Sequence, residues 1–489
     1  MALHLLHLSR GLHAKLVAPL ITISKHILFY SVSHTFHQTL SLPPQCHSPP
    51  HPSLPQFLQL LKRVSHSSSP ASESITLLDD SGFQANRDLI CSAIWELREE
   101  WKAAFVAFNW GNCYDDEKVC NLMIWVLGTH AKFSTAWSII GDMHRSSIST
   151  RQAMLIMIDR YAAANNATKA IQTFNFMEKF RLALDQEAFY ALLTSLCKHE
   201  NVEEAEEFML ANKKLFPLQT EGFNIILNGW CNITTDIFEA KRVWREMSKY
   251  CITPDATSYS HMISCFSKIG NLFDSLRLYD EMKRRGLIPT IEVYNSLVYV
   301  LTRENCLKEA IKVVDKMKEE GLQPYSATFN SMIRPLCEVG KLAEARIILN
   351  TMLEENLRPT IETYHAFLEV TDYEGTLEFL SKMKGSGLGP NEDSFLIILA
   401  KFLKLKQHAN AMKMWMEMKK CNVVPSCMHY KTMVEGLVTC RWFIKARDFY
   451  EEMISNGCSE DPKLRMIFQK ELVDSGDKGK QNVKKVTSY

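Results

Sequence analysis

The sequence lacks the short motifs on which many nucleotide-dependent and metal-dependent enzymes rely. It has no Gly-x4-Gly-Lys-Ser/Thr loop, whose backbone amides would hold phosphates. It also has no His-x-Glu with a Cys-x-x-Cys, the set with which zinc activates water in nucleobase deaminases. The glycine-rich stretch from Gly385 follows a helical segment, which is typical of a helix C-terminus rather than of a phosphate loop. We therefore expect no enzyme activity, no cofactor and no metal.

Closely spaced cysteine pairs of the Cys-x-x-Cys kind are also missing, although the chain contains 14 cysteines. They are scattered, and Cys197, Cys231 and Cys337 lie inside apolar helical patterns, where a free cysteine behaves as a small buried hydrophobe. Disulfide frameworks belong mostly to short secreted chains in oxidising compartments. We therefore expect free thiols, a reducing compartment and no zinc site.

Acidic residues are absent from the first 72 positions, which contain Arg10, Lys15, Lys25, Lys62 and Arg63. This stretch is rich in serine, histidine, leucine and proline, a composition typical of an organelle transit peptide. The alternative is a membrane anchor at LVAPLITISKHILFYSV, but its 17 residues include a central lysine, which disfavours a span. We expect residues 1–72 to be a disordered transit peptide, with no membrane span. The mitochondrion is the favoured destination, and the chloroplast is the alternative.

The net charge between the two ends of the chain is negative. The whole sequence carries +1, residues 1–72 carry +5 and residues 462–489 carry +4, so residues 73–461 carry −8. A strongly basic surface that holds polyanions by bulk charge is therefore excluded for the central part of the chain.

Residues of three kinds recur in the central part with one common period. Methionines are spaced by 35 residues, with a single gap of 31. They are Met247, Met282, Met317, Met352, Met383, Met418 and Met453. A proline follows each of the first six, and a small residue precedes each one at a constant distance. A fixed period of roughly 20–50 residues indicates a repeat architecture.

The unit at residues 256–290 explains the period. Tyr259, Met262, Ile263 and Phe266 form one apolar helical stripe, and a second stripe runs from Leu272 to Met282. From Gly286 onward, glycine or asparagine occupies one slot after the second helix of a unit, where a left-handed residue ends helices. A helical hairpin cannot bury its stripe alone, so neighbouring units must stack into an all-α solenoid.

The period divides the chain into four parts. Residues 1–72 are the transit peptide, and residues 73–116 hold a linker and a degenerate first repeat. Residues 117–461 form the regular array, which contains a short repeat of 31 residues at 361–391. Residues 462–489 are expected to form a capping helix and a basic disordered tail. In total we expect about ten to eleven repeats.

The repeats VYNSLVYVLTRENCLKEAIKVVDKMKEEGLQP and TFNSMIRPLCEVGKLAEARIILNTMLEENLRP resemble plain pentatricopeptide repeats of 35 residues. The resemblance covers roughly residues 117–461 and recurs in register about ten times. It implies a right-handed superhelix whose first helices line a concave groove. It also implies that each repeat reads about one nucleotide of single-stranded RNA.

By this resemblance, the fifth and the last residue of a repeat contact a base edge. Asn224 with Asp255 matches the family pattern well and is associated with uracil. The pairs of Asn295 with Tyr325 and Asn330 with Thr360 keep the asparagine, which favours a pyrimidine. The further candidates are Ser260 with Thr290, which leans towards a purine, His365 with Asn391, which departs from the pattern, and Asn121, whose partner is uncertain because of a register slip. Leu155/Asp185, Tyr190, Leu396/Ser426 and Lys431/Asp461 depart from the pattern.

The resemblance also places a basic residue at the thirteenth position of a repeat beside the RNA phosphates. The candidates are Lys198, Lys268, Arg303 and Lys404, whereas Glu338 and Thr439 break the row. The short repeat lacks the four residues that would form the last turn of its first helix. Four residues approximate one helical turn, so we expect the hairpin to pack normally but to interrupt the RNA track.

The leading hypothesis is a monomeric organellar protein that binds single-stranded RNA by occupancy, acting in RNA stability, processing, splicing or translation. Protein factors of RNA processing or translation are further candidate partners. The alternative is a helical scaffold that binds protein, for example a ribosome-associated subunit, because several contact positions are off-pattern and the array is acidic.

Overall fold

The computed structural model describes residues 53–66, 76–79, 82–456, 458 and 464–466. The first 52 positions of the expected transit peptide and the tail from residue 467 therefore lie outside the described residues, as does most of the expected capping helix. In the described part every regular element is a helix, which confirms the all-α prediction.

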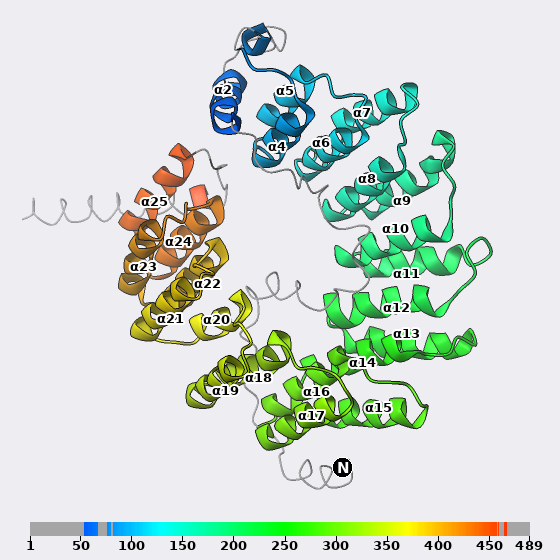
Figure 1. Cartoon of the computed structure of the whole chain (residues 1–489), viewed down its shortest axis with the longest axis vertical. Helices are drawn as coiled ribbons and strands as arrows, with labels where there is room; N and C mark the ends of the chain where they lie inside the picture. The colour runs from blue at the N-terminus through cyan, green and yellow to red at the C-terminus, as the bar shows by residue number, and fades with distance from the viewer. Residues whose placement is uncertain (1–52, 67–75, 80–81, 457, 459–463, 467–489) are drawn as a thin grey trace, which may run out of the picture. The chain divides into compact units, whose positions relative to one another are not determined.

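Eleven helical hairpins follow one another along the described chain (Figure 1). The first helices are α4 (Arg87–Glu96), α6 (Glu117–Thr129), α8 (Arg151–Ala163), α10 (Gln186–Lys198), α12 (Thr220–Asn228), α14 (Ala256–Lys268), α16 (Ile291–Arg303), α18 (Ser326–Glu338), α20 (Ile361–Leu368), α22 (Glu392–Lys404) and α24 (Cys427–Thr439). The second helices are α5 (Trp101–Trp110), α7 (Phe133–Arg145), α9 (Ala167–Phe176), α11 (Val202–Ala211), α13 (Ile237–Lys249), α15 (Leu272–Arg284), α17 (Leu307–Glu319), α19 (Leu342–Glu354), α21 (Tyr373–Gly385), α23 (His408–Lys420) and α25 (Phe443–Ser455).

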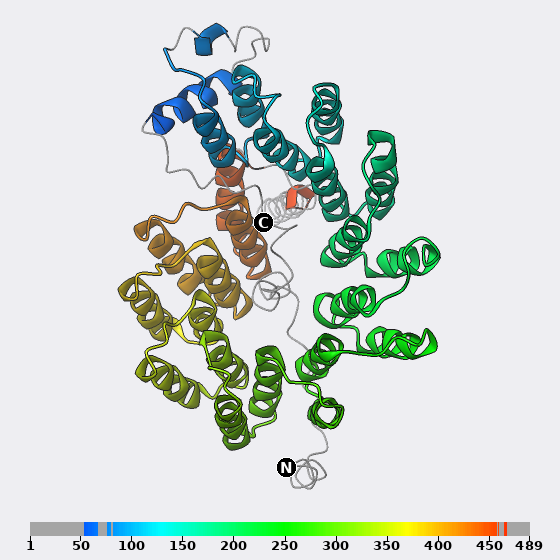
Figure 2. The ribbon, with the colours of Figure 1, turned by 45° about the vertical axis from the view of Figure 1, so that its right-hand side comes forward.

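The chain divides into two compact units, Met1–Val293 and Tyr294–Tyr489. In the first unit, α4, α6, α8, α10, α12 and α14 pack each against the next. In the second unit, α18, α20, α22 and α24 do the same. The second helices α5 to α15 and α19 to α25 each pack on their own first helix, as the paired ribbons of Figure 2 illustrate. In each unit the first helices thus form one continuous layer, which is the solenoid arrangement.

The repeated residues build the core that the sequence predicted. The recurring methionines Met247 to Met418 are fully buried, and so is the small residue seven positions before each of them. A small side chain there lets two helices approach closely. The slot after the second helix is left-handed, at Gly286 with φ 74° and at Asn356 with φ 59°. These are the residue types that tolerate this conformation.

Two repeats depart from the common length in their first helices. In the short repeat α20 has 8 residues where α18 and α22 have 13, while α21 keeps 13. This confirms that the last turn of the first helix is lost. In the repeat that begins at Thr220, α12 continues as a π-helical turn, Gly229–Ile233. A π turn holds one extra residue, which accounts for the register slip.

A helix lies inside the segment that was expected to be a disordered transit peptide. Helix α2 (Leu54–His66) packs on α4 and α5. Its Phe57 is fully buried, with a ring centroid 5.2 Å from that of Trp110. The packed part of the chain therefore begins before the expected boundary at residue 73, because α2 covers the apolar face of the first hairpin.

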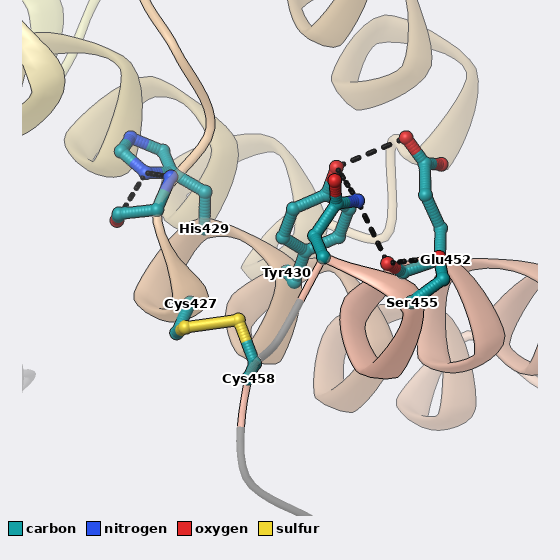
Figure 3. Close-up of a disulfide and its surroundings, with 8 residues drawn as sticks. Cys427, His429, Tyr430, Glu452, Ser455 and Cys458 are labelled. Carbon is teal, nitrogen blue, oxygen red and sulfur yellow. Dashed lines mark hydrogen bonds between the residues drawn. A yellow bond between two sulfur atoms is a disulfide. The ribbon is translucent and has the colours of Figure 1, made fainter. Parts of the chain in front are cut away.

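The expectation of free thiols is wrong for one pair of cysteines. Cys427, the first residue of α24, forms a disulfide with Cys458, which follows α25, and their Cα atoms are 5.7 Å apart (Figure 3). The two residues are 31 positions apart, yet the hairpin brings its beginning and its end together. Cys197, Cys231 and Cys337 are buried free thiols, as expected.

Among the residues that the structure describes, no helix combines the length and the apolar character needed to cross a membrane.

Candidate nucleic-acid interface

The predicted base-contacting residues come from two kinds of position in the first-helix layer. The fifth residue of a repeat lies in the first helix. The last residue of a repeat is the N-cap of the next first helix, as Asp255, Thr360 and Asn391 are for α14, α20 and α22. An N-cap side chain accepts from backbone amides at the helix start, so its position is fixed. Stacking of the first helices then brings the two positions together.

Asn224 and Asp255 form the pair that matched the family pattern best. Asn224 Nδ2 donates to Asp255 Oδ1 at 3.0 Å. The Asn224 carbonyl accepts from Ser258 Oγ at 2.6 Å, and Ser258 Oγ accepts from the Asp255 amide at 3.2 Å. The three side chains form a closed ring of hydrogen bonds that holds the Asn224 amide in one plane.

Asn330 and Thr360 form the same ring in another repeat. Asn330 Nδ2 donates to Thr360 Oγ1 at 3.1 Å, and the Asn330 carbonyl accepts from Thr363 Oγ1 at 2.6 Å. The Thr360 amide donates to Thr363 Oγ1 at 2.9 Å. This pair, which departs from the family pattern at its last residue, is thus structurally equivalent to Asn224 with Asp255.

His365 and its predicted partner Asn391 do not form a ring of this kind, because the two side chains are joined only through Ser394. His365 is 4 % exposed, and its Nε2 lies 2.9 Å from Ser394 Oγ, which donates to Asn391 Oδ1 at 2.8 Å. Burial lowers the pKa of His365, which favours the neutral imidazole. His365 is therefore a core residue of the short repeat that reaches Asn391 only through Ser394.

Three other predicted contact residues each have a buried oxygen without a hydrogen-bond partner. These atoms are Asn121 Oδ1, Thr290 Oγ1 and Asn295 Oδ1. A buried polar atom without a partner costs free energy, so it marks a place where a ligand or water would be stabilising. Ser260 lies half-buried on α14.

One pair of fifth and last residues could not be assigned from the sequence, because the repeat register slips by one residue near Gln219. Helix α12 begins at Thr220, so Gln219 is its N-cap and the last residue of the preceding repeat. Tyr190, the fifth residue of that repeat, donates from its hydroxyl to Gln219 Oε1 at 3.1 Å. The same positions are thus joined by a hydrogen bond although both side chains are off-pattern. The pair could be assigned only once the first residue of α12 was known.

Lys198 and Lys268, two of the predicted phosphate-contacting cations, each lie against an acidic or polar side chain inside the protein. Lys198 Nζ lies 3.6 Å from the carboxylate of the buried Asp159. Burial by itself raises the pKa of Asp159, but the His199 hydrogen bond and the neighbouring cations lower the pKa by more than burial raises it. The net pKa lies below its ordinary value, so the carboxylate is charged. Lys268 Nζ donates to Asn232 Oδ1 in the π turn at 2.8 Å.

The other two predicted cations have different surroundings. Arg303 is half-buried and near enough to Glu338 for its charge to act on that carboxyl, whose pKa is nevertheless raised by burial. Lys404 is exposed at the end of α22.

Lys401 is a charged residue of this layer that the sequence reasoning missed. It is 8 % exposed, and its Nζ donates to the carbonyls of Leu368 at 2.6 Å and Thr371 at 2.8 Å. It also donates to Thr376 Oγ1 at 2.8 Å. Burial lowers the pKa of Lys401 to about 7. The signal in the sequence was a lone lysine within the apolar run FLIILAKFL.

Comparison with known families gives two matches. Residues 253–446 match the pentacotripeptide-repeat region of PRORP, and residues 187–210 match a PPR repeat. A mitochondrial pentatricopeptide repeat-containing protein of Arabidopsis thaliana is 61% identical over 436 residues, which are 88% of this chain and 80% of that protein. A second mitochondrial protein of this kind from the same plant is 36% identical over 44% of this chain and 38% of its own length.

Solved structures give more distant matches. The pentatricopeptide repeat protein PPR10 from maize is 18% identical, with a TM-score of 0.36, and covers 85% of this chain and 65% of its own. Yeast Rmd9p in complex with a 16-nucleotide target RNA is 10% identical, with a TM-score of 0.33, and covers 84% of this chain and 97% of its own.

Proposed function

The chain belongs to the pentatricopeptide repeat family, and from that premise we propose that it binds single-stranded RNA along the layer that the first helices form in each of its two units. The observation that carries this proposal is the repeated ring of hydrogen bonds. Asn224 with Asp255 and Asn330 with Thr360 present the same polar pair at equal positions of two repeats. Side chains held in one orientation can discriminate between base edges, because each edge has its own order of donors and acceptors.

Each ring leaves polar groups for a base. Asn224 uses one N–H and one lone pair inside the ring, so a second N–H and a second lone pair are left for a ligand. Asp255 has its second carboxylate oxygen and Thr360 its hydroxyl. A pyrimidine edge, with adjacent acceptor and donor, complements such a pair. The unpartnered oxygens of Asn121, Thr290 and Asn295 support further contacts with donor groups of bases.

We propose that the protein acts by occupancy in the mitochondrion, with the chloroplast as the alternative. Its bound transcript would be protected, kept unpaired or presented for processing, splicing or translation. The names of two relatives from Arabidopsis support the mitochondrion. We propose no reaction, because no catalytic motif in the sequence suggests one.

The binding track is proposed to be interrupted at the short repeat. Helix α20 ends at Leu368, so its thirteenth position does not exist. His365 is buried against Ser394, and Lys401 directs its charge at backbone carbonyls rather than at solvent. The repeats before Thr360 therefore offer the better contacts, whereas Leu396 and Lys431 stand at the fifth positions of the repeats that follow.

Crosslinking in isolated mitochondria, followed by sequencing of the attached RNA, tests the proposal most directly. The recovered RNA and unrelated single strands are then compared in a gel shift at two salt concentrations. We expect the recovered RNA to bind more tightly than the unrelated strands, and Asn224→Ala to weaken that preference. If neither the recovered RNA nor any other strand is retained, RNA binding is contradicted.

The second candidate is a scaffold that binds protein. The charge of −8 on residues 73–461 and the internal partners of Lys198 and Lys268 favour it, because both weaken the attraction of the array for phosphates. In that case the same crosslinking experiment yields no RNA, and purification from mitochondria yields a stoichiometric protein partner.

A further inference from the structure

Three buried hydroxyls occupy one equivalent position, the third residue of α14, α20 and α22. All three side chains are 0 % exposed. Each reaches back to the fifth residue of the preceding repeat. The contacts are Ser258 Oγ to Asn224 Oδ1 at 2.6 Å, Thr363 Oγ1 to Asn330 Oδ1 at 2.6 Å, and Ser394 Oγ to His365 Nε2 at 2.9 Å.

We propose that this third-position hydroxyl is a positioning residue for base recognition, which decides which end of the preceding repeat's amide faces the RNA. The inference rests on the proposed function. An asparagine amide has a donor end and an acceptor end, and turning it by half a rotation exchanges them. A hydroxyl that is buried cannot itself touch a base, so its influence passes through the amide.

In the ring around Thr360 the hydroxyl of Thr363 is decisive. The Thr360 amide donates to Thr363 Oγ1, so the Thr363 proton is directed at the Asn330 carbonyl. The Thr360 hydroxyl can donate as well as accept, so by itself it would tolerate either orientation of Asn330. Without Thr363, both ends of the amide could face the RNA.

In the ring around Asp255 the same hydroxyl matters less. A carboxylate only accepts hydrogen bonds, so Asp255 alone forces the Asn224 amide to turn its N–H end inward. Ser258 then adds a second bond to an orientation that is already determined. The proposal therefore predicts unequal effects in two rings of equal geometry.

The repeat that begins at Ile291 supplies a natural control. Thr328 occupies the third position of α18, is fully buried and accepts from the Tyr325 amide at 3.4 Å. The Asn295 carbonyl has no hydrogen-bond partner, so Thr328 does not hold it. Substituting Thr328 thus removes the same helix-capping bond without removing a contact to the base-reading amide.

The test uses the full-length chain and a pool of short single-stranded RNAs of random sequence. Bound RNA is sequenced, and the preference at each nucleotide is compared between variants whose circular dichroism matches the wild type. Thr363→Val removes the hydroxyl at nearly constant volume, Thr363→Ser restores it, and Thr328→Val is the matched control. Asn330→Ala identifies the nucleotide that this repeat reads.

We expect Thr363→Val to relax the preference at the nucleotide identified by Asn330→Ala by roughly fivefold, in line with the loss of one hydrogen bond. Thr363→Ser restores the preference, Ser258→Ala has a smaller effect at its own nucleotide, and Thr328→Val has none. If the wild type binds RNA but Thr363→Val leaves the preference unchanged, this inference is overturned and the proposed function stands. The same holds if Thr328→Val changes the preference as much as Thr363→Val does. A wild type that retains no RNA contradicts the proposed function as well.

Discussion

At the scale of single residues, Lys401 compensates for the turn that α20 lacks. The carbonyls of Leu368 and Thr371 would accept from amides of the next turn if the helix continued. Lys401 comes from the following first helix and donates to both of them. Because the ammonium group is taken out of water for this purpose, its pKa falls from its ordinary value to about 7.

Lys401 makes the stability of the second unit depend on pH. The unfolded chain keeps the lysine protonated up to about pH 10.4, whereas the folded chain releases the proton near pH 7. Between these values the unfolded state binds more protons, so stability rises with pH, by up to about 1.4 kcal/mol per pH unit. We expect the melting temperature of the wild type to rise from pH 7 to pH 9 relative to that of Lys401→Met.

The exposed lysine of the same helix gives the control for this prediction. Lys404→Met should leave the pH profile of the wild type unchanged, because Lys404 lies at the surface. If the melting temperatures of wild type and Lys401→Met change by the same amount between pH 7 and pH 9, Lys401 is not the source of the pH dependence.

The sequence predicted the fifth-position asparagines but not the residues that hold them. Asn224 and Asn330 were found because the repeat resembles a known pattern at that position. Ser258 and Thr363 were not, because their partners are 34 and 33 residues away and meet only through stacking. Lys401 was missed for a similar reason, since the carbonyls that it caps are exposed only by a deletion in the previous repeat.

At the scale of elements, the disulfide closes the last hairpin. The bond between Cys427 and Cys458 spans α24 and α25, and removing it releases a loop of 31 residues in the unfolded chain. The loop-entropy estimate for this length is about 3–4 kcal/mol. We expect Cys458→Ser to increase amide hydrogen exchange in α24 and α25 and to leave the earlier hairpins unchanged.

The free thiol of Cys440 in the same hairpin serves as the control. Cys440→Ser should exchange as the wild type does, and reducing agent should affect the wild type but not Cys458→Ser. Recovery of Cys427 and Cys458 as alkylated free thiols from non-reduced protein would contradict the bond.

The two irregular repeats show why element boundaries differ in how well they can be predicted. A loss of four residues is close to one turn, so it can leave the first helix without disturbing the apolar stripe, and α20 is shortened as expected. A single extra residue has no such natural place. It could lengthen a loop or a helix, and the structure puts it in the π turn after Asn228, where Asn232 bonds to Lys268.

At the scale of the whole molecule, the net negative charge of residues 73–461 and the internal partners of Lys198 and Lys268 predict a weak dependence of RNA binding on salt. Each phosphate contact with a single strand contributes about 0.7 to the slope of log affinity against log salt. Lys404 is exposed, whereas Lys268 is held by Asn232. Because Lys404 lies past the proposed interruption and Lys268 is already bonded to Asn232, we expect Lys404→Ala and Lys268→Ala each to leave the slope unchanged. Affinities measured at four salt concentrations decide this, and a slope reduced by about 0.7 in either variant would contradict it.

The order of the repeats predicts the order of the nucleotides that they read. Asn224 and Asn330 belong to repeats that begin at Thr220 and Ser326, three units apart along the chain. If each repeat reads one nucleotide, the preferences relaxed by Asn224→Ala and by Asn330→Ala must lie three positions apart in the bound RNA. The interruption at α20 adds a second condition. Leu396→Ala and Lys431→Ala should leave every preference unchanged, whereas a nucleotide relaxed by either one would show that the track continues past the short repeat.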